Sequence, residues 1–130
     1  MINLNDIAWA AGFLEGDGHF GWHRDGKFLR KDGTYGKKYG QPVIVADQVN
    51  IEPLLKLQTI FGGWIGGPYK TNRQSRYRWE VSSNKAASIM MTLWHFLSTQ
   101  KRKQVEHALG TWRLTPTRGG FRRKSEKRDD

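Results

Sequence analysis

Hydrophobic residues follow two different periods along this chain, and the changes between them predict the order of its elements. Apolar positions recur at helical spacing in four segments, residues 7–15, 54–61, 87–97 and 105–112. Apolar and polar residues alternate instead in two pairs of segments, residues 19–30 with 41–49 and residues 64–70 with 77–83, each pair joined by a polar hairpin. The expected order is helix, two strands, helix, two strands and two further helices, which is an α+β pattern.

The first helical segment has one face made of small residues. Ala8, Ala11, Gly12 and Glu15 fall at positions i, i+3, i+4 and i+7, so they share a face. Such a face buries little apolar area in its own fold, and Gly12 costs about 1 kcal/mol against Ala inside a helix. The usual benefit of small residues is the close approach of a second backbone, so the pattern predicts a helix contact on this face.

Carboxylates are expected at the end of this helix. Asn5 or Asp6 is expected to cap its start, and the triplet Gly16-Asp17-Gly18 is expected to stop it. Glu15 and Asp17 then lie where the helix dipole favours cations. A magnesium or calcium ion would resolve this conflict, because carboxylates and free backbone carbonyls are the oxygen ligands that these ions prefer. The alternative is an ordinary Asp-Gly turn with Glu15 in solvent.

The charge of the chain points to a polyanionic partner. Lys and Arg number 22 against 12 Asp and Glu, which gives a formal net charge of +10. The excess is concentrated in the two expected hairpins, residues 22–40 and residues 70–78, and the second of these contains no acid. Nucleic acid is favoured over acidic lipid, because no basic amphipathic helix with an apolar insertion face is found.

Other features of the composition narrow the class of protein. The chain has no cysteine, which excludes disulfides and thiolate metal sites, and its four histidines show no ligand spacing. No apolar run reaches the length of a membrane span, and residues 1–5 lack the layout of a signal peptide. We therefore expect one soluble domain, without membrane contact, inside a cell: in cytoplasm, nucleoid or an organelle.

The segment Ala10 to Gly18, AAGFLEGDG, resembles the motif that names the LAGLIDADG homing endonucleases. The motif reads small-small-Gly, two large apolar residues, acid, small, acid, Gly; Ala10 stands where the family usually has a larger residue. The resemblance covers roughly residues 4–113. It implies an αββαββα-type domain, with helices packed on one face of a four-stranded antiparallel DNA-binding sheet. We expect this domain at residues 1–116 and a basic, flexible tail at residues 117–130.

The resemblance also implies an active site. The last acid of the motif, Asp17, would be the main ligand of Mg²⁺, for which Mn²⁺ can substitute, aided by the backbone carbonyl of Gly16. Glu15 matches the earlier acid, which is usually structural in the family. A polar residue at the end of the second strand and a lysine at the start of the final helix map to Gln48 and Lys101, where they would orient water and stabilise the phosphate. Asn50 and Lys103 are alternatives for these two roles.

DNA contacts are expected from the polar side chains of the two ribbons, because a major groove admits a two-stranded ribbon. On the first ribbon they are His23, Arg24, Lys27, Arg30, Lys37, Lys38, Tyr39 and Gln41. On the second ribbon they are Tyr69, Lys70, Asn72, Arg73, Gln74, Arg76 and Arg78. Arg and Gln can read base edges, whereas lysines at a hairpin tip such as Lys37 and Lys38 more often bind phosphate. For each single residue, a solvated strand face is the competing interpretation.

The chain holds one copy of the motif, which predicts a symmetric homodimer. Ala8, Ala11, Gly12 and Glu15 would form the contact at the two-fold axis and bring two Asp17 carboxylates together over the two scissile phosphates. A symmetric dimer should prefer a pseudo-palindromic site. The predicted function is then an intron-encoded, site-specific double-strand DNA endonuclease.

Two other functions remain open at this point. One is a non-cleaving protein on the same fold, such as a maturase that binds intron RNA or a regulator. The other is a basic nucleic-acid-binding or ribosome-associated module without enzymatic activity. The second would account for the charge but not for the small helix face and its acidic end.

Overall fold

A computed structural model of the 130-residue chain describes residues 2–23, 27–29, 31–37 and 40–114. The elements are, in order, α1 (Leu4–Asp17), β1 (Gly18–His23), β2 (Lys27–Leu29), β3 (Tyr35–Lys37), β4 (Gln41–Gln48), α2 (Glu52–Phe61), β5 (Trp64–Lys70), β6 (Ser75–Ser82), α3 (Ser83–Leu93), a 3-10 turn (Trp94–Phe96) and α4 (Thr99–Leu114). The predicted α+β class is confirmed. None of the helices in the described part of the chain is long and apolar enough to cross a membrane.

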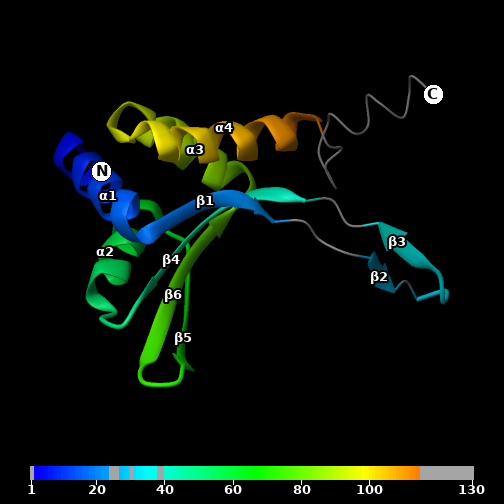
Figure 1. The fold of residues 1–130 in the computed structure, drawn as a ribbon. Coiled ribbons are helices and arrows are strands. Elements are labelled where there is room, and N and C mark those ends of the chain that lie inside the picture. The colour runs from blue at the N-terminus through cyan, green and yellow to red at the C-terminus, as the bar shows by residue number, and fades with distance from the viewer. Residues whose placement is uncertain (1, 24–26, 30, 38–39, 115–130) are drawn as a thin grey trace.

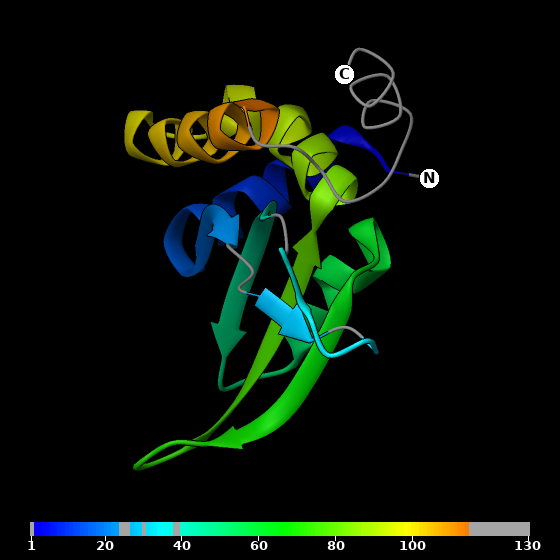
Figure 2. The ribbon, with the colours of Figure 1, turned by 90° about the vertical axis from the view of Figure 1, so that its right-hand side faces the viewer.

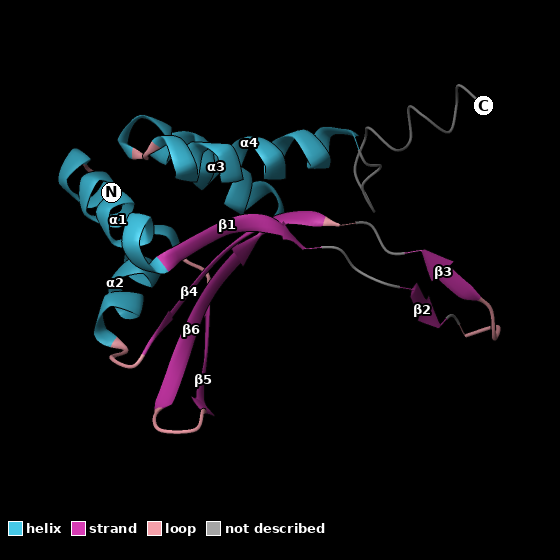
Figure 3. Ribbon diagram, viewed as in Figure 1, coloured by secondary structure: helices cyan, strands magenta, loops and turns pink. Residues whose placement is uncertain are grey.

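The main sheet has four antiparallel strands in the order β1-β4-β6-β5. Figures 1 and 3 show the helices along one side of this curved sheet. In Figure 2 the β5–β6 hairpin extends farthest from α3 and α4. The predicted four-stranded sheet with helices on one face is therefore confirmed, and none of the described helices covers its other face, the open face.

The first ribbon differs from its prediction. The expected single strand over residues 19–30 is divided, since β1 ends at His23 and β2 pairs with β3 in a separate two-stranded sheet. The β1–β4 ladder ends where His23 pairs with Gln41, and the indole of Trp22 lies so close over Gly40 that a Cβ there would be 2.6 Å from the ring. The expected tail at residues 117–130 lies outside the described residues.

One hydrophobic core lies between the helices and the sheet. Alternate residues of β4 and β6, including Ile44, Ala46, Trp79 and Val81, are buried and face the helices. The indole N–H of the fully buried Trp79 donates to the backbone carbonyl oxygen of Gly62 at 2.9 Å, so its polar group is satisfied. Because strand side chains alternate, the residues between these point to the open face.

The ends of α1 differ from the predicted ones. Asn3, rather than Asn5 or Asp6, caps the helix, since its side chain accepts a hydrogen bond from the backbone N–H of Asp6 at 2.8 Å. The helix also continues through Asp17 instead of stopping before it. At Gly18 the backbone N–H donates to the carbonyl of Leu14, and a Cβ would lie 2.6 Å from Leu14 Cδ2, so a glycine is needed where helix turns directly into strand.

Candidate active site and nucleic-acid interface

The C-terminal end of α1 meets β4 and α4. Asp17 is the last residue of α1 and is exposed. The next residue, Gly18, pairs with Ala46, so the register brings the end of α1 to the level of Asp47 and Gln48 at the end of β4. Gln48 is partly buried and pairs with Tyr77 on its other side. The predicted pair Asp17 and Gln48 thus lies at one end of the sheet.

Lys101 approaches the same place from α4. Its Nζ donates a hydrogen bond to the backbone carbonyl oxygen of Gly18 at 2.7 Å. An ammonium has three donors, so two remain for another acceptor near Asp17. The alternative lysine, Lys103, instead lines a depression of about 570 Å³ between β1 and α4, together with residues such as His19 and His107. The structure therefore brings Lys101, rather than Lys103, to the end of α1.

Glu15 joins α1 to the start of α4. Its Oε1 accepts the backbone N–H of Ser98 at 2.9 Å and its Oε2 accepts the Ser98 hydroxyl at 2.6 Å. These hydrogen bonds hold the pKa of Glu15 below its ordinary value. The Ser98 hydroxyl also accepts the backbone N–H of Lys101 at 3.3 Å, so Glu15 supports the turn from which Lys101 extends. Glu15 thus makes a contact within its own chain, and its predicted place in a dimer contact stays a prediction.

The donor set at Asp17 fits a hard divalent cation in part. The last turn of a helix leaves carbonyl groups without intrahelical partners. The N–H that would bind the carbonyl of Gly16, that of Phe20, donates instead to Gln104 Oε1 at 3.2 Å. The Asp17 carboxylate and the Gly16 carbonyl are therefore suitable oxygen ligands. In the part of the chain that the structure describes, no group of three or more His, Cys, Asp and Glu side chains could hold a metal, so Asp17 and Gly16 form only part of a coordination shell.

The small-residue face of α1 differs in part from the predicted one. Ala11 is only 1% exposed and packs in the core of its own chain, so it is not available for the predicted dimer contact. Ala8 and Gly12 are exposed, and Gly16 continues their row at helical spacing. A Cβ added at Gly12 or Gly16 would meet no atom within 4 Å. The exposed small-residue face of α1 therefore consists of Ala8, Gly12 and Gly16, and Ala11 is not part of it.

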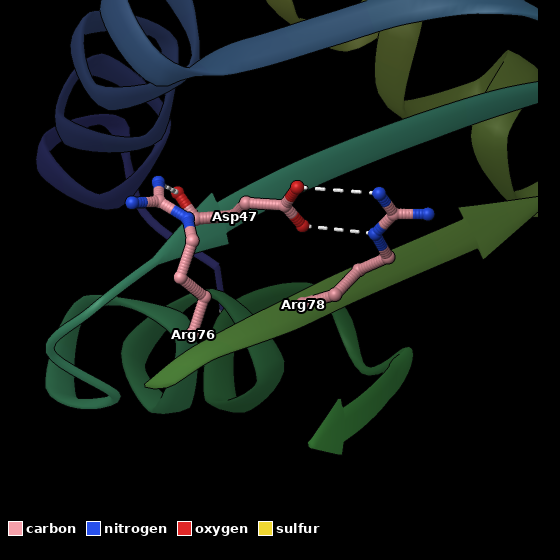
Figure 4. A network of polar contacts seen from close by, with 3 residues as sticks. All are labelled: Asp47, Arg76 and Arg78. Carbon is pink, nitrogen blue, oxygen red and sulfur yellow. Dashed lines mark hydrogen bonds and ion pairs between the residues drawn. The ribbon is translucent and has the colours of Figure 1, made fainter. Parts of the chain in front are cut away.

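The open face of the sheet carries an ion pair between neighbouring strands. Arg78 of β6 lies opposite Asp47 of β4 in the register. Its Nε and Nη2 donate to Asp47 Oδ1 and Oδ2 at 2.8 and 3.2 Å, as Figure 4 shows. The hydrogen bonds that Arg78 donates to Asp47 raise the pKa of Arg78, so this guanidinium stays charged. A basic group and its carboxylate thus occupy the centre of the predicted DNA-binding face.

The second ribbon brings together the residues predicted on it. Tyr69 and Lys70 end β5, while Arg76 and Arg78 lie on β6. The tip between them is closed by Thr71, whose backbone N–H and hydroxyl donate to the carbonyl of Gln74 at 3.0 and 2.6 Å. Thr71 and the predicted residues Asn72, Arg73 and Gln74 line a shallow depression at this tip.

The first ribbon places its predicted residues along two separate sheets. His23 and Gln41 form the last pair of the β1–β4 ladder, whereas Lys27 and Lys37 pair with each other in the β2–β3 sheet. Arg24, Arg30, Lys38 and Tyr39 lie outside the described residues. The structure therefore unites the second predicted cluster, whereas the described residues of the first lie on two sheets.

Sequence reasoning missed two polar residues at these sites. Asp47 has a weak sequence signal, because it follows Val43 and Val45 at alternate positions and so shares their face of β4. Its pairing with Arg78 depends on strand order, which the pattern does not contain. Ser98 has a clearer signal, since Ser-Thr before a polar helix is a typical helix start.

Comparison with known proteins bears on the family and the fold of the chain. The sequence profile described as LAGLIDADG endonuclease matches residues 10–107. No match was found among curated proteins. Among solved structures, I-CeuI, a group I intron-encoded homing endonuclease complexed with DNA, superimposes with a TM-score of 0.62 at 15% identity, covering 88% of this chain and 56% of that one.

Two other homing endonucleases have the same fold. I-CvuI, in complex with the I-CreI target, gives a TM-score of 0.57 at 24% identity, covering 80% of this chain and 65% of that one. The archaeal intron-encoded I-Vdi141I, complexed with DNA, gives 0.57 at 19% identity, covering 82% and 67%. The present chain thus spans less than two thirds of I-CeuI and of I-CvuI. The profile match over most of its length, the motif helix and the shared fold together show that the chain belongs to the LAGLIDADG endonuclease family.

Proposed function

We propose that this protein is a site-specific DNA endonuclease that acts as a homodimer on a pseudo-palindromic duplex and requires Mg²⁺ or Mn²⁺. The observation that carries the proposal is the convergence of an exposed carboxylate, Asp17, with the ammonium of Lys101 at the end of the motif helix. Family membership supports this reaction class. The basic residues of the second ribbon, Lys70, Arg73, Arg76 and Arg78, support duplex DNA as the substrate.

Four residues of the chain have separate roles in the proposed hydrolysis. Asp17 and the carbonyl of Gly16 would hold a divalent metal, which supplies Lewis acidity and a water of lowered pKa when bound. Gln48 would orient a water, because its amide both donates and accepts hydrogen bonds. Lys101 would stabilise the negative charge that develops on the phosphate, with the donors that Gly18 leaves free.

A second copy of the chain completes this site. One chain supplies the carboxylate of Asp17 and too few other acids for a metal among its described residues. The exposed row of Ala8 and Gly12 would let α1 pack against α1 of a partner, which brings two such ends together at a two-fold axis. Two nearby carboxylates repel each other unless cations lie between them, so dimer formation and metal binding support each other.

The test is cleavage of a randomised duplex DNA library in magnesium, followed by sequencing of the new ends. We expect recurrent staggered cuts around a two-fold centre. Asp17→Asn should abolish them, because the amide loses the charge that holds the metal. Glu106→Gln, which removes one acid from an exposed position on α4, should cut like the original protein.

Two results would overturn this proposal. If neither magnesium nor manganese gives cuts while the protein enriches particular RNA or DNA sequences, it is a binding protein or a maturase. If Asp17→Asn cuts as fast as the original protein, the carboxylate has no role in hydrolysis.

A further inference from the structure

The contact between Asp47 and Arg78 fixes the plane of the guanidinium. The two residues are direct partners in the β4–β6 register, and both Nε and Nη2 of Arg78 bind the two carboxylate oxygens (Figure 4). A bidentate contact between two planar groups allows one orientation, whereas a single hydrogen bond allows rotation. Arg78 is thus a preorganised cation.

Both side chains face the open side of the sheet. Their neighbours Ala46 and Trp79 are buried against the helices, so Asp47 and Arg78 point the other way. Their side chains are 40% and 44% exposed, and they line a depression of about 400 Å³ with Tyr69, Thr71 and Arg76. An ion pair this exposed contributes little to folding stability, because water competes for both charges. Its contribution to folding stability therefore does not account for this ion pair.

The free edge of Arg78 matches one base. With Nε and one Nη2 hydrogen on Asp47, the second Nη2 hydrogen and both Nη1 hydrogens remain. These donors form a two-point edge that fits the O6 and N7 acceptors of guanine in the major groove. The carboxylate beside them repels phosphate, which disfavours a backbone contact at the same place.

Arg76, on the same strand, has a guanidinium that is held less firmly than that of Arg78. Its Nη2 lies 3.5 Å from the backbone carbonyl oxygen of Asp47, a long contact that leaves the guanidinium loosely held. Of the two arginines, only Arg78 has its plane fixed by a carboxylate. The charges of the two are equal, so the difference between them is orientation.

We infer that Asp47 is a specificity-determining positioning residue, which holds Arg78 in the orientation that reads guanine and keeps it from binding phosphate. The inference rests on the proposed function, because it requires duplex DNA on the open face. In this inference Asp47 acts by holding the guanidinium of Arg78, and it takes no part in metal binding.

The experiment is binding of a randomised duplex library in calcium, with the bound DNA sequenced for four proteins. These are the original protein, Asp47→Asn, Arg78→Lys, which keeps the charge but loses the fork, and Glu106→Gln as the matched loss of one acid. The original protein should prefer guanine at one position of each half-site by roughly 5- to 150-fold, the range for a bidentate contact. Asp47→Asn and Arg78→Lys should both lose most of that preference at that position alone, and Glu106→Gln should keep it.

Salt dependence separates orientation from charge. Asp47→Asn frees Arg78 for phosphate, so the slope of log affinity against log salt should become steeper by about 0.9 per added contact. Arg78→Lys should lose the guanine preference without this change. Thermal unfolding should be nearly the same for all four proteins, which keeps a folding defect from imitating the result.

The outcomes are distinguishable. An Asp47→Asn profile identical to the original one, at every position, overturns this inference and leaves the proposed function in place. An original protein that enriches no DNA sequence overturns both.

Discussion

Lys101 donates its Nζ hydrogen bond to the carbonyl oxygen of Gly18, the residue directly after Asp17, although the bonded residues are 83 positions apart in the chain. The contact fixes a cation from the last helix beside the carboxylate that ends the first. Ser98, which Glu15 binds, positions the turn before Lys101. The two acids of the motif thus differ in their surroundings: Glu15 binds Ser98 at the start of α4, whereas Asp17 is exposed at the end of α1.

Replacement of Lys101 by methionine should slow cleavage by roughly 10²- to 10³-fold, the range for loss of one donor that stabilises transition-state charge. Affinity for DNA in calcium should change little, since only one of many cations is lost. The measurement is a single-turnover cleavage rate beside a binding curve. Lys103→Met is the control, because Lys103 lines the depression between β1 and α4, whereas the hydrogen bond to Gly18 comes from Lys101. An equal loss from Lys103→Met would contradict the assignment.

Glu15→Gln should destabilise the fold by about 1 kcal/mol, the usual effect of losing one hydrogen bond to a helix start. The pKa of Glu15 is lowered in the folded state, so its charged form favours folding. The difference in unfolding free energy between the original protein and Glu15→Gln should be complete above about pH 5 and shrink as the pH falls through the folded pKa. Urea unfolding across pH 3 to 7 measures it. A difference that grows toward low pH would contradict the assigned contact.

The sequence predicted the class, the strand pairs and the motif helix, because each depends on local periodicity or capping. The placement of Asp17 at the helix end follows from the glycines around it. Strand order does not follow from such signals: β4 lies between β1 and β6, and only that order brings Asp47 opposite Arg78. The contact from α4 to Gly18 is equally non-local.

Ala11 shows why the helix face was misjudged. Positions 8, 11, 12 and 15 share a face at helical spacing, but the boundary between core and surface depends on where the sheet and α3 lie. In the structure Ala10, Ala11 and Leu14 lie in the core, whereas Ala8 and Gly12 face outward. An alanine fits both environments, so composition alone could not assign Ala11.

Gly18→Ala should destabilise the protein by about 1–3 kcal/mol, the range for overpacking a tight site. A Cβ there would lie 2.6 Å from Leu14 Cδ2 and 2.9 Å from the Leu14 carbonyl oxygen, and the backbone atom cannot move aside easily. Gly16→Ala is the matched control, since its Cβ meets nothing within 4 Å. The measurement is chemical unfolding of both variants. Equal stabilities would show that the α1–β1 junction relaxes around the added methyl group.

Gly12→Leu should prevent formation of the proposed homodimer while leaving the chain folded. Gly12 is exposed on α1 and an added Cβ meets no atom within 4 Å, so we expect a larger side chain there to obstruct a second molecule packed on this face. Gly110→Leu is a matched control, because Gly110 is also a helical glycine with open space, on α4. Both replacements should favour the helix itself, since glycine costs about 1 kcal/mol there. Sedimentation at several concentrations should give a monomer for Gly12→Leu and a dimer for Gly110→Leu. A Gly12→Leu dimer that still cuts DNA would mean that the two copies meet through another surface.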